Sequence, residues 1–173
     1  MDRPFVCLLT GPAGAGKSTV ATLLAKRTER CAVINVDHLH DMVVSGYVRQ
    51  WPANDESRLQ TDLGAENACD LALNFVEKGF NVIIDGVIGE RLYKKYTEAL
   101  HEHNFSVFLF LPSKEVLLKR FDDREVDHDL RVRTQELHER FSVLRDKLGW
   151  YVVDSSNQTP EETVGEILGK MAK

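Results

Sequence analysis

A short stretch near the start of the chain combines glycine, lysine and hydroxyl side chains in a spacing that suits phosphate. The sequence GPAGAGKSTV, residues 11–20, matches G-x-x-x-x-G-K-[ST] at every fixed position. Glycines let the backbone turn so that N–H groups face phosphate oxygens, and the start of a helix adds partial positive charge. Lysine reaches the β- and γ-phosphates, and the serine hydroxyl binds Mg²⁺. The stretch therefore predicts a cradle for ATP or GTP with Mg²⁺, formed by Gly11, Ala13, Gly14, Ala15, Gly16, Lys17, Ser18 and Thr19, with Ser18 as a metal ligand.

Two acidic residues follow apolar runs that are typical of buried strands. Asp85 follows NVII, and Asp37 follows CAVINV. Because ligands bind beyond the carboxyl ends of parallel strands, both acids should lie beside the cradle. Asp85 is expected to hold Mg²⁺, and Asp37 is expected to accept a proton from a hydroxyl that attacks the γ-phosphate. The two roles could be exchanged, so both are candidates for contact with an acceptor, and either acid could instead cap a helix.

Arginines surround the polar stretch FDDREVDHD, residues 121–129. Arg120 and Arg124 are one helical turn apart and share a face of the expected helix. A segment of about residues 122–134 could fold over the triphosphate as a lid, exclude water and neutralise developing charge. Arg120 and Arg124 are therefore candidate catalytic residues together with Lys17 and Asp37, and Arg120 is also a candidate nucleotide contact. Alternatively, the arginines pair with neighbouring acids on a solvated helix face.

The irregular segment of about residues 38–60 is the expected acceptor side of the site. Trp51 offers a flat apolar wall, and Arg49 could hold an anionic or hydroxyl group. His40 is a third candidate, and Arg58 and Gln60 are further ones. The sequence HLH lacks the i, i+4 histidine pair of a zinc helix, so no zinc site is expected.

The elements that must position these residues alternate between short apolar runs and longer helical patterns. Such alternation predicts βαβ units, hence one parallel sheet with helices on both faces. The long helix should bury Leu63, Ala68, Leu71, Ala72 and Phe75. The expected strands are residues 5–10, 31–37, 81–86, 105–112 and 150–154, and the expected helices are 17–26, 55–78, 90–103, 114–121, 130–148 and 160–171.

Length and composition limit the class of protein. A chain of 173 residues fits one domain, and its net charge of -5 argues against a nucleic-acid or anionic membrane partner. No apolar run approaches the ~20 residues of a membrane helix, and the first residues lack a secretory signal pattern. Three widely spaced cysteines in apolar surroundings indicate buried reduced thiols. We expect a cytoplasmic monomer or homodimer.

Four segments together resemble those of small P-loop kinases: GPAGAGKST, NVDHLH, NVIIDG and LLKRFDDRE. The chain is most similar to the group that contains chloramphenicol phosphotransferase, gluconate kinase and shikimate kinase, with AAA-type ATPases beside them, and the likeness in element order covers essentially the whole chain. It implies a three-layer αβα P-loop NTPase fold with a five-stranded parallel sheet of order 2-3-1-4-5 and an arginine-bearing lid. It also implies that Asp37 is the base and that adenine lies against the loop that begins at Asp154.

The predicted function is transfer of the γ-phosphate of ATP to a hydroxyl of a small molecule, with Mg²⁺. The second strand lacks the D-x-D acids of shikimate kinases, and the arginine-rich substrate patterns of nucleoside monophosphate kinases are missing, which favours a neutral or unusual acceptor. The alternative is an ATPase or nucleotide-dependent switch that acts on a protein partner. The guanine-reading motif Asn/Thr-Lys-x-Asp does not occur in the sequence.

Overall fold

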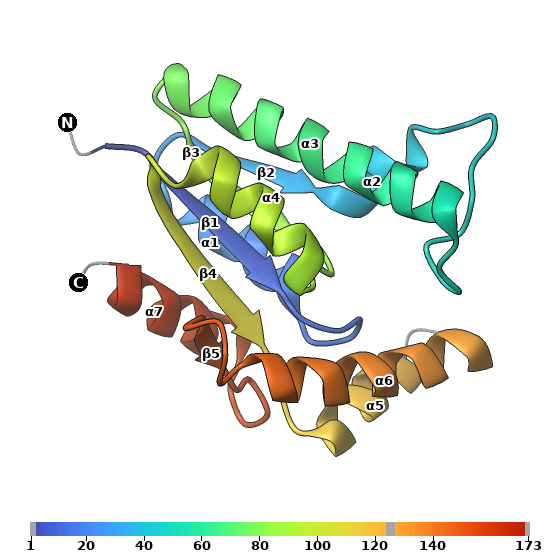
Figure 1. The fold of residues 1–173 in the computed structure, drawn as a ribbon. Helices are drawn as coiled ribbons and strands as arrows, with labels where there is room; N and C mark the ends of the chain where they lie inside the picture. Colours follow the sequence, from blue (N-terminus) through green and yellow to red (C-terminus); the bar gives the residue numbers. More distant parts are fainter. Residues whose placement is uncertain (1–2, 124–126, 172–173) are drawn as a thin grey trace.

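The computed structural model describes residues 3–123 and 127–171. A parallel five-stranded sheet of order β2-β3-β1-β4-β5 forms its centre, with helices on both faces (Figure 1). This order is the predicted one. The strands are β1 (Phe5–Thr10), β2 (Cys31–Asn35), β3 (Asn81–Asp85), β4 (Asn104–Phe110) and β5 (Tyr151–Val153), and the helices are α1 (Lys17–Lys26), α2 (Val36–Asp41), α3 (Asp55–Glu77), α4 (Glu90–Leu100), α5 (Lys114–Asp122), α6 (His128–Leu144) and α7 (Pro160–Met171).

Alternate residues of the central strands pack against helices on opposite faces of the sheet. Val6 and Leu8 of β1 belong to a core that includes side chains of α3, α4 and α6. Cys7 and Leu9 belong to a second core with side chains of α1, α5 and α7. The side chains of β1 from Val6 to Leu9 are fully buried on both faces of the sheet, which explains why this strand is an unbroken apolar run. The two cores fix the carboxyl end of β1, where the cradle begins.

The chain turns into a helix earlier than expected after the second strand. β2 ends at Asn35, and the Asn35 Oδ1 accepts hydrogen bonds from the backbone N–H of Asp37 at 2.9 Å and of His38 at 3.3 Å. An asparagine cap of this kind starts a helix. Asp37 therefore lies in the first turn of α2 and not at the end of a strand.

The buried face of α3 consists of small side chains. The expectation holds for Ala68 and Ala72, which are fully buried, and is wrong for Leu63, Leu71 and Phe75, which are 43%, 37% and 36% exposed. One position along a helix turns the side chain by about 100°, and the small residues let α3 pack close to the sheet. The buried residues of α3 are Ser57, Gln60, Gly64, Ala65, Ala68, Cys69 and Ala72.

The three cysteines are free thiols, as predicted. Cys7 and Cys69 are buried and Cys31 is half-buried, and burial raises the pKa of Cys31 and of Cys69 to about 11. Burial also raises the pKa of Cys7. The thiols therefore stay protonated at neutral pH. None of the described helices has the length and apolar character that crossing a membrane requires.

Candidate active site

The phosphate cradle follows β1 directly. At Gly11 φ is 136°, and a Cβ there would lie 2.3 Å from the carbonyl oxygen of Phe110 in β4, so only glycine fits. Gly16, with φ 96°, is the N-cap of α1 and directs the first N–H groups of that helix into the loop. Lys17 is 7% exposed, and its Nζ donates a hydrogen bond to the carbonyl oxygen of Pro12 at 3.0 Å. The lysine side chain therefore lies against the loop in which phosphate is predicted to bind.

Ser18 and Asp85 bring a hydroxyl and a carboxylate together at the start of α1. Asp85 is 3% exposed and lies in register with Leu9 of β1 and Asn35 of β2. Burial raises the pKa of Asp85, while the charge of Lys17 and a hydrogen bond with Ser18 act in the opposite direction. Hydroxyl and carboxylate oxygens are ligands that Mg²⁺ accepts when phosphates and waters complete its shell. The donor set therefore fits Mg²⁺.

A cavity of about 800 Å³ opens beside the cradle. Its walls come from Ala13 of the cradle, from α2, from the loop of residues 42–54, and from α3, α4 and α6. Figure 1 shows this loop and the α5–α6 region at the end of the molecule toward which the arrowhead of β1 points. Asp85 is absent from the described residues that line the cavity, whereas the other predicted acceptor contacts all line it: Asp37, His40, Arg49 and Trp51.

The loop of residues 42–54 is fixed by side chains of α3. Gln60 is 4% exposed; its Nε2 donates to the carbonyl oxygen of Gly46 at 2.7 Å, and its Oε1 accepts from the N–H of Val48 at 3.0 Å. At the other end of the loop, Asn54 and Ser57 cap α3 by exchanging hydrogen bonds, each of 2.8 Å. Gln60 was a candidate acceptor contact, and in the structure it holds the loop that carries Arg49 and Trp51.

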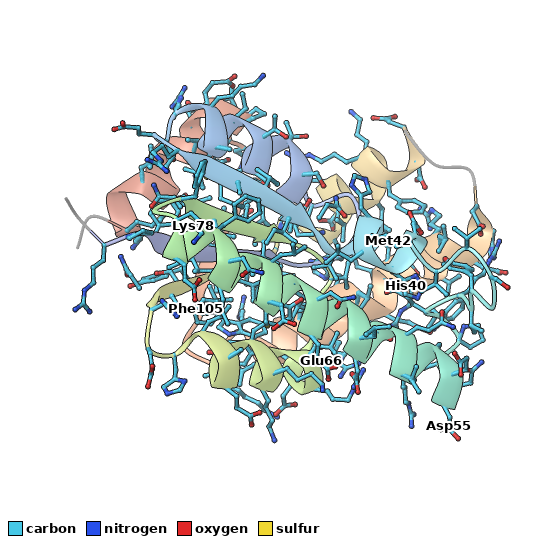
Figure 2. All side chains as sticks on the ribbon, turned by 90° about the horizontal axis from the view of Figure 1, so that it is seen from above. His40, Met42, Asp55, Glu66, Lys78 and Phe105 are labelled. Atoms are coloured by element: carbon cyan, nitrogen blue, oxygen red, sulfur yellow. The ribbon has the colours of Figure 1, made fainter. Side chains whose placement is uncertain are left out.

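Among the predicted acceptor contacts that line the cavity, His40 is the most buried. It is 3% exposed and meets Tyr47 edge-on, with ring centroids 4.9 Å apart. Figure 2 shows it at the same end of the molecule as Asp55, the first residue of α3. Among the described residues nothing forms a hydrogen bond with its Nε2, which is buried. A buried ring nitrogen of this kind costs free energy until a partner supplies the bond.

Arg120 and Arg131, which lie on either side of the polar stretch, form hydrogen bonds with different partners. Arg120 donates from Nη1 to the hydroxyl of Ser155 at 3.1 Å and from Nη2 to its carbonyl oxygen at 2.8 Å. Arg131 forms two hydrogen bonds with the carboxylate of Asp122, of 2.7 and 3.2 Å, so it follows the alternative of pairing with a nearby acid. Arg124 lies outside the described residues, as do residues 124–126 of the predicted lid.

Ser155 connects three parts of the nucleotide side. Its hydroxyl donates to the carbonyl oxygen of Ala15 in the cradle at 3.4 Å and accepts the bond from Arg120. It therefore joins α5, the cradle and the loop after β5. Asp154, the predicted adenine-side residue, accepts a hydrogen bond from the N–H of Ser156 at 3.0 Å and shapes this loop. Thr19 lies exposed in the first turn of α1.

The sequence-based prediction missed residues of the site, among them Arg140 and Ser155. Arg140 lines the cavity from α6, and Leu130, Arg133 and Leu137 line it from the same helix at spacings of three and four. That helical spacing was a usable signal. Ser155 lies in the loop that the resemblance places against adenine, but its bonds to Arg120 and Ala15 could not be predicted, because these partners are 35 and 140 positions away along the chain.

A family model described as an AAA domain matches residues 7–147. The chain belongs to this family. A 2-phosphoglycerate kinase of Pyrococcus horikoshii is 28% identical to this AAA domain over 148 residues, which cover 72% of the chain and 48% of the relative. The chain therefore spans about half the length of the curated relative that it matches.

Solved structures similar to this AAA domain include small-molecule kinases. A gluconokinase from Sinorhizobium meliloti matches with a TM-score of 0.71 and 22% identity over 99% of the chain and 94% of its own. A shikimate kinase from Acinetobacter baumannii in complex with shikimate matches with a TM-score of 0.66 and 19% identity, over 98% and 93%. These likenesses confirm the predicted P-loop kinase fold. The family supports nucleotide binding in general.

Proposed function

We propose that this AAA domain transfers the γ-phosphate of ATP to a hydroxyl of a small molecule. The cavity of about 800 Å³ carries the proposal, because it shares Ala13 with the cradle and has Asp37 in its wall. A hydroxyl compound held there would lie beside the terminal phosphate. The relative named 2-phosphoglycerate kinase and the neighbours named gluconokinase and shikimate kinase support transfer to such a compound.

On the donor side, the backbone N–H groups of the cradle and Lys17 bind the phosphates. Lys17 would exchange its hydrogen bond to the carbonyl oxygen of Pro12 for phosphate oxygens. Ser18 and Asp85 would hold Mg²⁺, which neutralises phosphate charge when it is bound. Arg120 would contribute from α5, where its two hydrogen bonds to Ser155 hold it against the loop after β5.

On the acceptor side, we assign the role of base to Asp37, since it lines the cavity and Asp85 does not. The acceptor oxygen forms a bond to the γ-phosphorus while the bond from this phosphorus to the β,γ-bridging oxygen breaks, and ADP leaves. Asp37 accepts the hydroxyl proton. Holding the two reactants in line can contribute roughly 7–11 kcal/mol to lowering the barrier.

Turnover with a panel of hydroxyl compounds tests the proposal. The protein is incubated with Mg-ATP and neutral, carboxylated and phosphorylated sugars and polyols, and the phosphorylated product is followed by ³¹P NMR beside ADP formation. We expect one class to give product and the Lys17→Ala variant to give none. The proposal fails if no compound raises ADP formation above the slow background. Nucleotide-dependent capture of a protein partner would then support the switch instead.

A further inference from the structure

The cavity is rich in one kind of cationic side chain. Arginine residues from a loop and three helices line it, and no lysine is among the described residues of its lining. The whole chain has a net charge of -5, whereas in the lining of the cavity five arginines outnumber four aspartates. The guanidinium group presents parallel N–H donors that match carboxylate and phosphate oxygens. The arginines of the lining are Arg49, Arg58, Arg91, Arg133 and Arg140.

Three of these arginines have no anionic partner among the residues that the structure describes. Arg91 pairs with Asp62 and Arg133 pairs with Glu136 at 3.2 Å. Within residues 3–123 and 127–171, the side chains of Arg49, Arg58 and Arg140 form neither an ion pair nor a hydrogen bond. These three come from the loop, from α3 and from α6, so separate elements bring them to one cavity.

The carboxylates of the lining do not neutralise them. Asp127 is occupied at the start of α6, where its Oδ1 accepts from the N–H groups of Asp129 at 2.9 Å and Leu130 at 3.2 Å. Asp37 and Asp41 lie on α2, and Asp129 lies in the first turn of α6. None of these four acids forms an ion pair with a described arginine of the cavity.

The surroundings leave room for a ligand next to the arginines. Gly89 has no side chain, and a Cβ there would lie 3.7 Å from Nη2 of Arg140. Trp51 forms part of the wall, with the guanidinium carbon of Arg133 6.0 Å from its ring centroid. Phe121 and Phe141 add apolar surface. The cavity thus combines anion-binding donors with walls suited to a carbon skeleton.

We propose that the acceptor carries a carboxylate or phosphate group, which Arg49, Arg58 and Arg140 bind while its hydroxyl faces Asp37. This inference rests on the proposed function and names the class of acceptor. It narrows the expectation of a neutral or unusual acceptor, drawn from the missing sequence motifs, to an anionic one. A bound anion would supply the charge partner that the three arginines lack.

Binding without turnover tests the anion site. The Lys17→Ala variant, which weakens the other anion site of the chain, is titrated by calorimetry with glycerol, glycerate and glycerol 3-phosphate, and with glucose, gluconate and glucose 6-phosphate. We expect at least one anionic compound to bind and the neutral ones not to bind. Adding Arg58→Gln or Arg140→Gln should weaken this binding by at least about tenfold, since hydrogen bonds to charged groups are strong. Comparison of carboxylates with phosphates identifies which anion is preferred.

Arg145→Gln is the matched control, because Arg145 pairs with Asp146 at 3.2 Å and does not line the cavity. It should bind like the parent, and circular dichroism of each variant should match the parent spectrum. The inference fails if no anionic compound binds, if neutral compounds bind equally well, or if Arg58→Gln and Arg140→Gln both bind like Arg145→Gln.

Turnover separates this inference from the proposed function. With Mg-ATP, Arg58→Gln should raise the KM of the acceptor and leave the KM of ATP within about twofold. If glucose or glycerol is phosphorylated as efficiently as its anionic counterpart, the anion inference fails and the kinase proposal stands. If an anion binds through the arginines but no compound is phosphorylated, the anion site stands and the kinase proposal fails.

Discussion

Arg120 donates two hydrogen bonds to Ser155, one of 3.1 Å to its hydroxyl and one of 2.8 Å to its carbonyl oxygen. The same hydroxyl reaches the carbonyl oxygen of Ala15 in the cradle at 3.4 Å. An arginine expected in a lid over the triphosphate is thereby tied to the loop after β5. The contact links the position of α5 to the position of the cradle, so its loss should affect nucleotide binding before it affects phosphotransfer.

The Ser155→Ala variant should bind ATP at least about twofold more weakly, because it loses two side-chain hydrogen bonds that each contribute about 0.5–1.5 kcal/mol. The turnover number at saturating ATP should change by less than twofold. Titration with a fluorescent ATP analogue measures the affinity. Ser142→Ala is the control, since Ser142 bonds to the carbonyl oxygen of His138 within α6. Unchanged ATP affinity in Ser155→Ala would show that the contact is only structural.

Removing the charge of Asp37 and removing the charge of Asp85 should have different effects on turnover. Asp37→Asn should reduce turnover by about 10²- to 10⁴-fold, as expected for loss of a general base, and leave ATP affinity within about twofold. Asp85→Asn should raise the Mg²⁺ concentration needed for half-maximal turnover. Steady-state kinetics across a Mg²⁺ series distinguishes the variants. Equal losses of ATP affinity and turnover in Asp37→Asn would contradict its role as base.

The burial of Asp85 predicts that its ionised carboxylate, which is expected to hold Mg²⁺, lowers the stability of the folded protein. Burial raises the pKa of this carboxyl above its ordinary value of 3.8, so its ionised form costs the folded state free energy. This cost is absent at low pH and appears as the pH rises through the ordinary pKa toward the raised one. Without nucleotide and Mg²⁺, Asp85→Asn should therefore have a higher Tm than the parent at pH 7.

The difference in Tm between Asp85→Asn and the parent should shrink as the pH falls and vanish about one unit below the ordinary pKa of 3.8, where the carboxyl is protonated in both the folded and the unfolded state. Thermal unfolding followed by circular dichroism from about pH 3 to about pH 7 gives the comparison. A lower Tm for Asp85→Asn at pH 7 would mean that the contacts with Lys17 and Ser18 outweigh the burial.

Two glycines of the cradle should differ in their tolerance of alanine. A Cβ at Gly11 would lie 2.3 Å from the backbone oxygen of Phe110, whereas one at Gly16 would meet nothing within 4 Å. Gly16→Ala should cost about 1–2 kcal/mol of unfolding free energy for its left-handed φ. Gly11→Ala should cost more, at least about 3 kcal/mol, because backbone must move. Urea unfolding compares them, and equal midpoints would refute the steric explanation.

The cradle was predictable because its residues are contiguous and its chemistry is local. The sheet order followed from the resemblance, and the structure confirms it. The start of α2 was missed because the Asn35 cap competes with continuation of an apolar run. The buried face of α3 was assigned to its large residues, while Ala68 and its small neighbours allow the closer packing. The gathering of arginines depends on how α3 and α6 are placed in space, which spacing within either helix does not determine.

The anchoring of the acceptor loop by Gln60 has a consequence for protein engineering. Gln60 holds Gly46 and Val48 from a buried position on α3, and the Asn54–Ser57 cap closes the other end. The sheet and the cradle take no part in either attachment. Residues 49–53 therefore form a cassette whose side chains can be exchanged while both anchor points are kept. Grafting this cassette between related domains should exchange the contacts of Arg49 and Trp51 with the acceptor, while the contacts of Arg58 and Arg140 and the handling of ATP stay with the recipient.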